Sequence, residues 1–138
     1  MKKEEEKMSL QSIAILDVGK ENITKLLTGF GEAYKGIGVG NDSTAVNQST
    51  QEHLLGDETC FKDGNASYRI LENNSYAAQW SNVFQYNDLP SNQLCEAAVS
   101  INASNQTTAC LLRCTFDPVI LGSGEQFSIT LQVIPMQP

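Results

Sequence analysis

His53 is the only histidine of the chain and the side chain best suited to acid-base chemistry. A serine or cysteine nucleophile would need it as general base, and most zinc sites not built from cysteine alone would need it as a ligand. It stands in the polar run 50–54, so we expect a solvated loop or helix-end histidine. The acids around it are Glu52, Asp57, Glu58 and Asp63. They could supply a glycosidase carboxylate pair, but their spacing does not set the separation that this chemistry needs. We therefore expect no enzyme activity.

Four cysteines could serve metal binding, redox chemistry or core packing: Cys60, Cys95, Cys110 and Cys114. None has the C-x2-C spacing typical of zinc sites, so we expect neither a metal nor another cofactor. Strands over 94–101 and 109–116 could pair as a hairpin with their apolar faces on the same side. The numbers of two residues that lie opposite each other would then add up to an odd number. A sum of 209 places Cys95 opposite Cys114, which makes a cross-strand disulfide feasible. The alternative, which we favour, is that the cysteines are free and fill a core row.

The run Gly36-x-Gly38-x-Gly40 resembles part of a phosphate-binding loop. The dinucleotide fingerprint G-x-G-x-x-G requires its third glycine where Asn41 stands, and a helix must follow it. Here a polar stretch, 41–50, follows instead, and no Gly-Lys-Ser/Thr is present. We therefore expect these glycines to let a strand pack closely against its neighbours.

Aromatic residues gather in the segment 76–86: Tyr76, Trp80, Phe84 and Tyr86. Tyr76 and Trp80 could form a stacking platform for a glycan, which is the site expected if the protein is a carbohydrate- or receptor-binding module. However, Trp80, Phe84 and Tyr86 share the parity of the inward face of a strand. Core packing is therefore the favoured interpretation.

The net charge of −7 argues against nucleic-acid binding, which depends on many cationic contacts to phosphate. The longest apolar run, Ile13–Leu16, is far shorter than the roughly 20 residues of a membrane helix, so we expect no membrane span. The first seven residues mix acids with bases and lead into no apolar core, which is unlike a secretory signal.

The spacing of Ile23, Leu26, Leu27 and Phe30 predicts one short helix from Asp17, with Gly29 placed to end it. A short strand is expected at 34–40. Alternating apolar residues predict further strands near 78–86, 94–101, 109–116 and 127–133. With 138 residues we expect one domain. The prediction is an all-β protein, an antiparallel β-sandwich of jelly-roll or immunoglobulin-like type preceded by one short N-terminal helix. Residues 1–16 are expected to be a docking arm and residues 17–138 the single domain.

The order of these segments resembles a family of small structural proteins of tailed bacteriophages, described as tail-fibre, tail or capsid-decorating proteins. The resemblance runs from about Asp17 to Met136. Its segments are the helix 17–29, the strand and loop 34–45, the aromatic strand 80–86, the Glu-Ala-Ala-Val turn 96–99, the Arg-containing strand 111–116 and the closing alternating strand 124–131.

This resemblance implies a non-enzymatic virion protein that decorates the capsid or forms part of the tail or tail fibre. It implies that the chain is made in the host cytoplasm and leaves with the particle. Its partners would be other capsid or tail proteins and further copies of itself, with a trimer as the first expectation.

Overall fold

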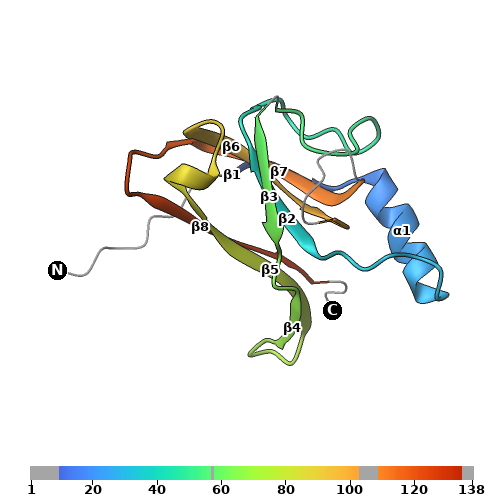
Figure 1. Cartoon of the computed structure of the whole chain (residues 1–138). Coiled ribbons are helices and arrows are strands. Elements are labelled where there is room, and N and C mark those ends of the chain that lie inside the picture. Colours follow the sequence, from blue (N-terminus) through green and yellow to red (C-terminus); the bar gives the residue numbers. More distant parts are fainter. Residues whose placement is uncertain (1–9, 57, 103–108, 135–138) are drawn as a thin grey trace.

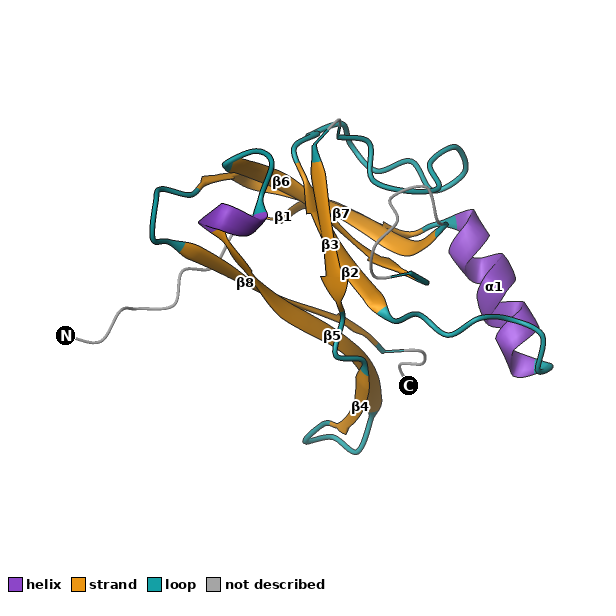
Figure 2. Cartoon of the chain, viewed as in Figure 1, coloured by secondary structure: helices purple, strands orange, loops and turns teal. Residues whose placement is uncertain are grey.

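The structure, a computed structural model, describes residues 10–56, 58–102 and 109–134. Its strands form two antiparallel sheets (Figure 1). The five-stranded sheet has the order β1-β7-β6-β2-β3, and the three-stranded sheet has the order β4-β5-β8. Figure 2 shows the two sheets as separate layers, with α1 at one end of the five-stranded sheet. The predicted all-β sandwich with a short helix near its start is therefore confirmed.

The described elements follow one another along the chain as β1 (Leu10–Ile15), α1 (Asp17–Leu27), β2 (Gly36–Gly40), β3 (Thr59–Asp63), β4 (Ser67–Ile70), β5 (Tyr76–Gln85), the 3-10 turn η1 (Tyr86–Asp88), β6 (Gln93–Ser100), β7 (Cys110–Ile120) and β8 (Gln126–Val133). The helix and the strands β2, β5, β6, β7 and β8 lie where the sequence predicts them. The strands β1, β3 and β4 were not predicted.

The strand β1 changes the expected domain boundary at residue 16. It pairs with β7 along the edge of the five-stranded sheet, with Ile13 opposite Cys114. Leu16 follows it and has no exposed surface. Residues 10–16 therefore belong to the sandwich and not to a docking arm, and a strand precedes the helix. Residues 1–9 of the expected arm lie outside the described residues.

The main core fills the space between the two sheets. Its large apolar members come from both layers and include Trp80, Phe84, Phe116, Phe127, Ile37, Leu112 and Ile129. The rings of Phe116 on β7 and Phe127 on β8 stack with centroids 5.8 Å apart. Burial of such large apolar surfaces supplies most of the favourable free energy of folding.

The helix α1 approaches the sheet through a glycine. A Cβ on Gly19 would meet the backbone carbonyl oxygen of Leu111 on β7, so only glycine allows this close approach. After the helix, Gly29 has a positive φ of 84°, which glycine adopts at no steric cost. Leu27 and Phe30 at this end are 83% and 81% exposed, so the apolar face of the helix is only partly buried.

Candidate functional site

The most organised polar cluster lies on the face of the five-stranded sheet that is turned away from the three-stranded sheet. There Glu96 of β6 and Arg113 of β7 form an ion pair in which Nε of the arginine is 3.0 Å from Oε1 of the glutamate. Neither side chain has exposed surface. The pairing of β6 with β7 brings the two side chains together, since Glu96 lies opposite Thr115 and Arg113 lies opposite Ala98.

The loop that joins β2 to β3 covers this ion pair. We call its described residues 41–56 the capping loop. Glu96 accepts backbone hydrogen bonds from both ends of it, from Asp42 at 3.2 Å, Leu55 at 3.0 Å and Gly56 at 2.7 Å. A carboxylate that accepts several N–H bonds and one guanidinium bond is well satisfied despite its burial. Glu96 therefore fixes the two ends of the capping loop to the sheet.

Arg113 holds the middle of the same loop. Its guanidinium donates to the carbonyl oxygens of Thr44 at 2.7 Å and Asp42 at 3.1 Å, and to Oε1 of Gln51 at 3.2 Å. The carboxylate of Asp42 lies 3.6 Å away. Hydrogen bonds from Thr44, and then the charge of Arg113, lower the pKa of Asp42 below its usual range. None of the five guanidinium N–H donors reaches water here. The charge can be buried because these protein acceptors take the place of water.

Glycines make room for the cluster. A Cβ on Gly40 would meet the carboxylate of Glu96, and one on Gly56 would meet the same carboxylate at 2.5 Å. On β2, a Cβ at Gly38 would overlap the ring of Phe61, which lies on the neighbouring strand β3. The predicted role of the glycine run, close packing of a strand against its neighbours, is confirmed, since all residues of β2 are buried.

A second, smaller apolar cluster lies beneath the capping loop: Leu16, Leu54, Ala98 and Cys110. Leu54 from the loop is 1% exposed, so the loop is packed as well as hydrogen-bonded. The polar stretch 41–50 is therefore part of a structural cover for one face of the sheet.

The cysteines do not pair as one alternative expected. The observed β6–β7 register has a sum of 211, in which Ala97 and not Cys95 lies opposite Cys114. The predicted parity is right over 96–99, but the pairing there lies two residues from the predicted one, and Cys95 itself falls at the register shift between Leu94 and Glu96. All four cysteines are free. The disulfide between Cys95 and Cys114 is therefore wrong for this structure, and the favoured alternative of free, mostly buried cysteines is confirmed.

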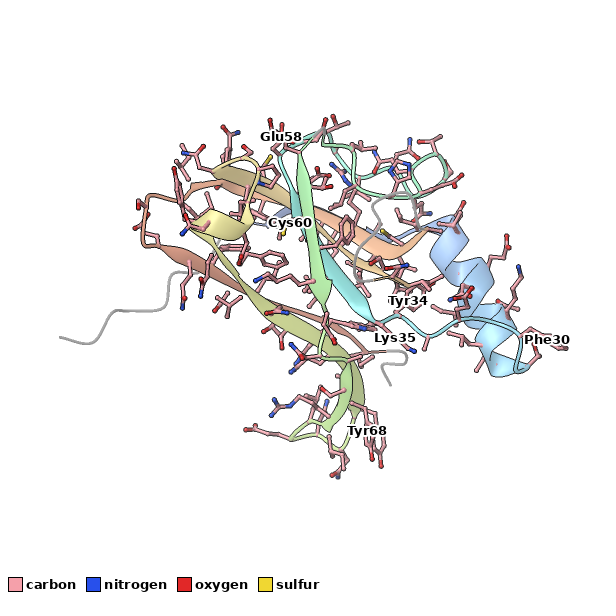
Figure 3. All side chains as sticks on the ribbon, in the orientation of Figure 1. Phe30, Tyr34, Lys35, Glu58, Cys60 and Tyr68 are labelled. Atoms are coloured by element: carbon pink, nitrogen blue, oxygen red, sulfur yellow. The ribbon has the colours of Figure 1, made fainter. Side chains whose placement is uncertain are left out.

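Burial also makes the thiols poor nucleophiles. Desolvation raises the pKa of Cys110 to about 12 and that of Cys114 to about 11. Desolvation likewise raises the pKa of Cys95 and of Cys60, the half-buried cysteine on β3 labelled in Figure 3. Since the thiolate is the reactive form, none of these residues is prepared for catalysis at neutral pH.

The other candidate catalytic residues are not brought together. His53 is half-buried, and its Nδ1 lies 2.8 Å from the carbonyl oxygen of Leu54, a backbone contact. Glu58 is exposed and borders an open hollow of about 570 Å³ with Tyr86 and the 87–92 turn. Asp57 lies outside the described residues. Within 10–56, 58–102 and 109–134, no group of three His, Cys, Asp or Glu side chains could hold a metal ion.

The two aromatic residues of the alternative glycan site separate in the structure. Trp80 is 6% exposed, and its indole N–H donates to the carbonyl oxygen of Tyr34 at 2.9 Å. It therefore belongs to the core and offers no stacking face. Tyr76 is 60% exposed, and on the same face of the β4–β5 hairpin Ile70 lies opposite it and Tyr68 opposite Ala78. We call Tyr68, Ile70 and Tyr76 the hairpin patch; Figure 3 shows Tyr68 on the hairpin, away from the five-stranded sheet.

Sequence reasoning missed the Glu96–Arg113 pair. Each residue lies on the face of its strand opposite the row of alternating apolar residues, and nothing in its local sequence marks it as buried. The available signals were a glutamate and an arginine on like faces of neighbouring strands, flanked by Ala98 and Leu111, and a loop bounded by Gly40 and Gly56. These signals become meaningful only once the capping loop is known to cross this face.

Comparison with protein families, curated proteins and solved structures found no match for this chain. Among the described elements, no helix has the length and apolar character required to cross a membrane.

Proposed function

We propose that this protein is a non-enzymatic structural component of a tailed-phage virion, an accessory protein that decorates the capsid or forms part of the tail or tail fibre. It would be made in the host cytoplasm and carried with the particle. Its partners would be other capsid or tail proteins and further copies of itself, with a trimer as the first expected assembly.

The observation that supports this proposal is that several segments resembling the phage family lie next to one another in the structure. Glu96 comes from the segment 96–99, Arg113 from 111–116, and the acceptors Asp42 and Thr44 from 34–45. Arg113 contacts each of the other three, and Glu96 also accepts from the backbone of Asp42. Three of the segments that carry the phage resemblance therefore meet where the capping loop is held on the sheet, with Asp42 at a position where this chain differs from the family. This supports an architectural rather than a catalytic role for them.

A loop that is hydrogen-bonded to the sheet at several points suits a particle component that must remain folded outside the cell. Buried ion pairs contribute conformational specificity in some proteins, and here the pair selects one arrangement of a long polar loop. The raised pKa values of Cys110 and Cys114 and the backbone contact of His53 also support a structural rather than an enzymatic role.

The test is to look for the chain in tailed-phage particles purified from the source culture. Density-gradient fractions analysed by mass spectrometry should contain the chain in many copies per particle, co-migrating with the major capsid protein. Recovery only from the soluble fraction, with none on particles, would contradict the proposal. Deletion of residues 1–9, which leaves β1 whole, should abolish incorporation while preserving the fold if this segment docks the protein.

The hairpin patch favours a second candidate function, a carbohydrate- or receptor-binding β-sandwich module. Tyr68 and Tyr76 present exposed aromatic surface on one face of a hairpin, the arrangement on which sugar rings stack. Screening the chain against immobilised bacterial surface glycans tests this candidate. Binding that Tyr76→Ala abolishes and Phe30→Ala leaves intact would support it, whereas equal loss in both variants would exclude the hairpin patch as the site.

A further inference from the structure

The strand β8 is the least protected edge of the sandwich. Among the strands of the described part of the chain, four pair on one side only: β1, β3, β4 and β8. Edge strands are normally protected by charges, prolines, bulges or short length. The register of β1 shifts near its start, β3 carries Lys62 and Asp63, and β4 has four residues including Arg69. By contrast, β8 has eight residues without charge or proline and pairs with β5 without a register shift.

The hydrogen bonds of β5 show which backbone groups of β8 face outward. The N–H of Ser81 donates to Gly64 at 2.7 Å, on the side of β5 away from β8. Because backbone groups alternate along a strand, those of Trp80, Asn82 and Phe84 face β8. Their partners on β8 are Leu131, Ile129 and Phe127. The N–H and C=O groups of Ser128, Thr130 and Gln132 therefore point to the open edge, where no described strand pairs with β8.

We propose that β8 is a self-association edge, at which two copies of this chain pair antiparallel about a two-fold axis at Thr130. In an antiparallel pair of like strands, the two-fold axis makes the sum of paired residue numbers constant. A sum of 260 places Thr130 opposite Thr130 and Ser128 opposite Gln132. All three of these residues offer their backbone groups to the edge, so each pair exchanges hydrogen bonds.

The same register continues the core across the interface. It places Ile129 opposite Leu131 and Phe127 opposite Val133, so the inward apolar rows of the two copies form one row on one face of a six-stranded sheet. A register shifted by one residue would set the apolar row of one copy against the polar row of the other. The side chains facing outward are the exposed Ser128, Thr130 and Gln132, which carry no charge.

A second copy is the occupant that this edge fits best. The chain as a whole carries a net charge of −7, so two copies repel at most of their surface. The β8 edge is an uncharged stretch, and its alignment on itself satisfies the outward backbone groups and the apolar row together. The antiparallel β8–β8 contact joins two chains. Combined with the trimer of the proposed function, it would give a six-chain assembly, and without the trimer it gives a dimer.

Native mass spectrometry and sedimentation equilibrium of the full chain test the pairing. We expect a dimer or a hexamer, and a monomer or a trimer as the largest species would overturn the proposal. Thr130→Lys places two ammonium groups opposite each other at the axis and should abolish the even-numbered species. Ser67→Lys is the matched control, because it puts the same charge on the exposed β4 edge of the same sheet and should leave the assembly unchanged. The proposal would also be overturned if Thr130→Lys and Ser67→Lys formed the same oligomers.

Covalent trapping tests the register and does not depend on the folding of the lysine variant. Hydrogen-bonded antiparallel pairs have Cα atoms about 5.5 Å apart, which lies within the range that a disulfide spans. Thr130→Cys should therefore give a dimer on mild oxidation that reductant dissolves, while Ser67→Cys, an equally accessible edge thiol, should stay monomeric under denaturing conditions. Equal yields of covalent dimer from the two variants would contradict pairing at β8. Because this readout concerns isolated chains, its failure leaves the particle experiment unaffected.

Discussion

Nε of Arg113 lies 3.0 Å from Oε1 of Glu96, and neither side chain exposes any surface to solvent. Burying two charges costs several kcal/mol per ion in hydration, and the pair offsets this cost only if its other polar atoms are satisfied. In this protein the capping loop supplies the remaining partners. In the part of the chain that the structure describes, no buried side-chain nitrogen or oxygen lacks a hydrogen-bond partner.

Removal of the arginine should be strongly destabilising. Arg113→Met leaves the buried carboxylate of Glu96 without its counter-charge, a change that typically costs about 3–5 kcal/mol. We expect a loss of that size in the free energy of unfolding, measured in urea by the emission of the buried Trp80.

Two further variants identify the cause of that loss. The double variant Glu96→Gln with Arg113→Met should recover part of the stability, since no unpaired charge remains buried. Lys25→Met removes one partner of the exposed pair with Glu21 on α1 and should change the free energy of unfolding by no more than about 0.5 kcal/mol. Similar losses from Arg113→Met and Lys25→Met would contradict a special role for burial.

The close approach of β2 to Glu96 gives a second prediction. Gly40→Ala would place a methyl group against the carboxylate and should destabilise the protein by about 1–3 kcal/mol through overpacking. Gly122→Ala is the control, because its Cβ would meet only the flexible side chain of Glu125 at 3.2 Å. Thermal unfolding followed by circular dichroism compares the two. A smaller loss for Gly40→Ala than for Gly122→Ala would show that the loop yields to the added methyl.

The burial of the thiols predicts a graded reactivity. In the native protein at pH 8, iodoacetamide should modify the half-buried Cys60 first and leave Cys110 and Cys114 unmodified. In denaturant all four should react without prior reduction, since the structure has no disulfide. Intact-mass spectrometry counts the added groups. A mass that stays unchanged in denaturant until reductant is added would overturn the free-thiol assignment.

The raised thiol pKa values make the fold sensitive to alkali. An unfolded cysteine loses its proton near its ordinary pKa of 9.0, whereas Cys110 in the fold keeps it until about 12. The unfolded state therefore binds fewer protons in this window, and stability falls as pH rises above about 9, by roughly 1 kcal/mol per pH unit for one thiol. Urea titrations between pH 8 and pH 11 should show a shallower decline for Cys110→Ala. If the unchanged protein and Cys110→Ala lose stability equally with rising pH, Cys110 is not the cause of the alkaline sensitivity.

Much of the sandwich could be predicted because its strongest patterns are local. The alternation of Phe127, Ile129, Leu131 and Val133 marks β8 without any knowledge of neighbouring strands, and Gly29 marks the end of the helix. The edge strand β1 was missed because its six residues follow a charged segment and its apolar positions form a run rather than an alternation. The four residues of β4 are all exposed, so they carry no burial pattern to detect.

The polar cluster could not be predicted for a different reason. Whether Glu96 faces water or the capping loop depends on contacts between residues 40 or more positions apart, which no local pattern encodes. The register error at Cys95 has the same origin. The β6–β7 pairing over 96–99 lies two residues from the predicted one, because alternation fixes only the parity of the pairing and not its register.

The hydrogen bonds that Glu96 accepts from the capping loop suggest an order of folding. The amides of Asp42, Leu55 and Gly56 find their acceptor only after β6 has joined the sheet, and the acceptors of Arg113 are placed only after β7 has joined. We therefore expect the capping loop to close late, as one cooperative unit. These three amides should exchange their hydrogens with solvent deuterium at a common rate, faster than the amides of β6 and β7, and Arg113→Met should accelerate all three together.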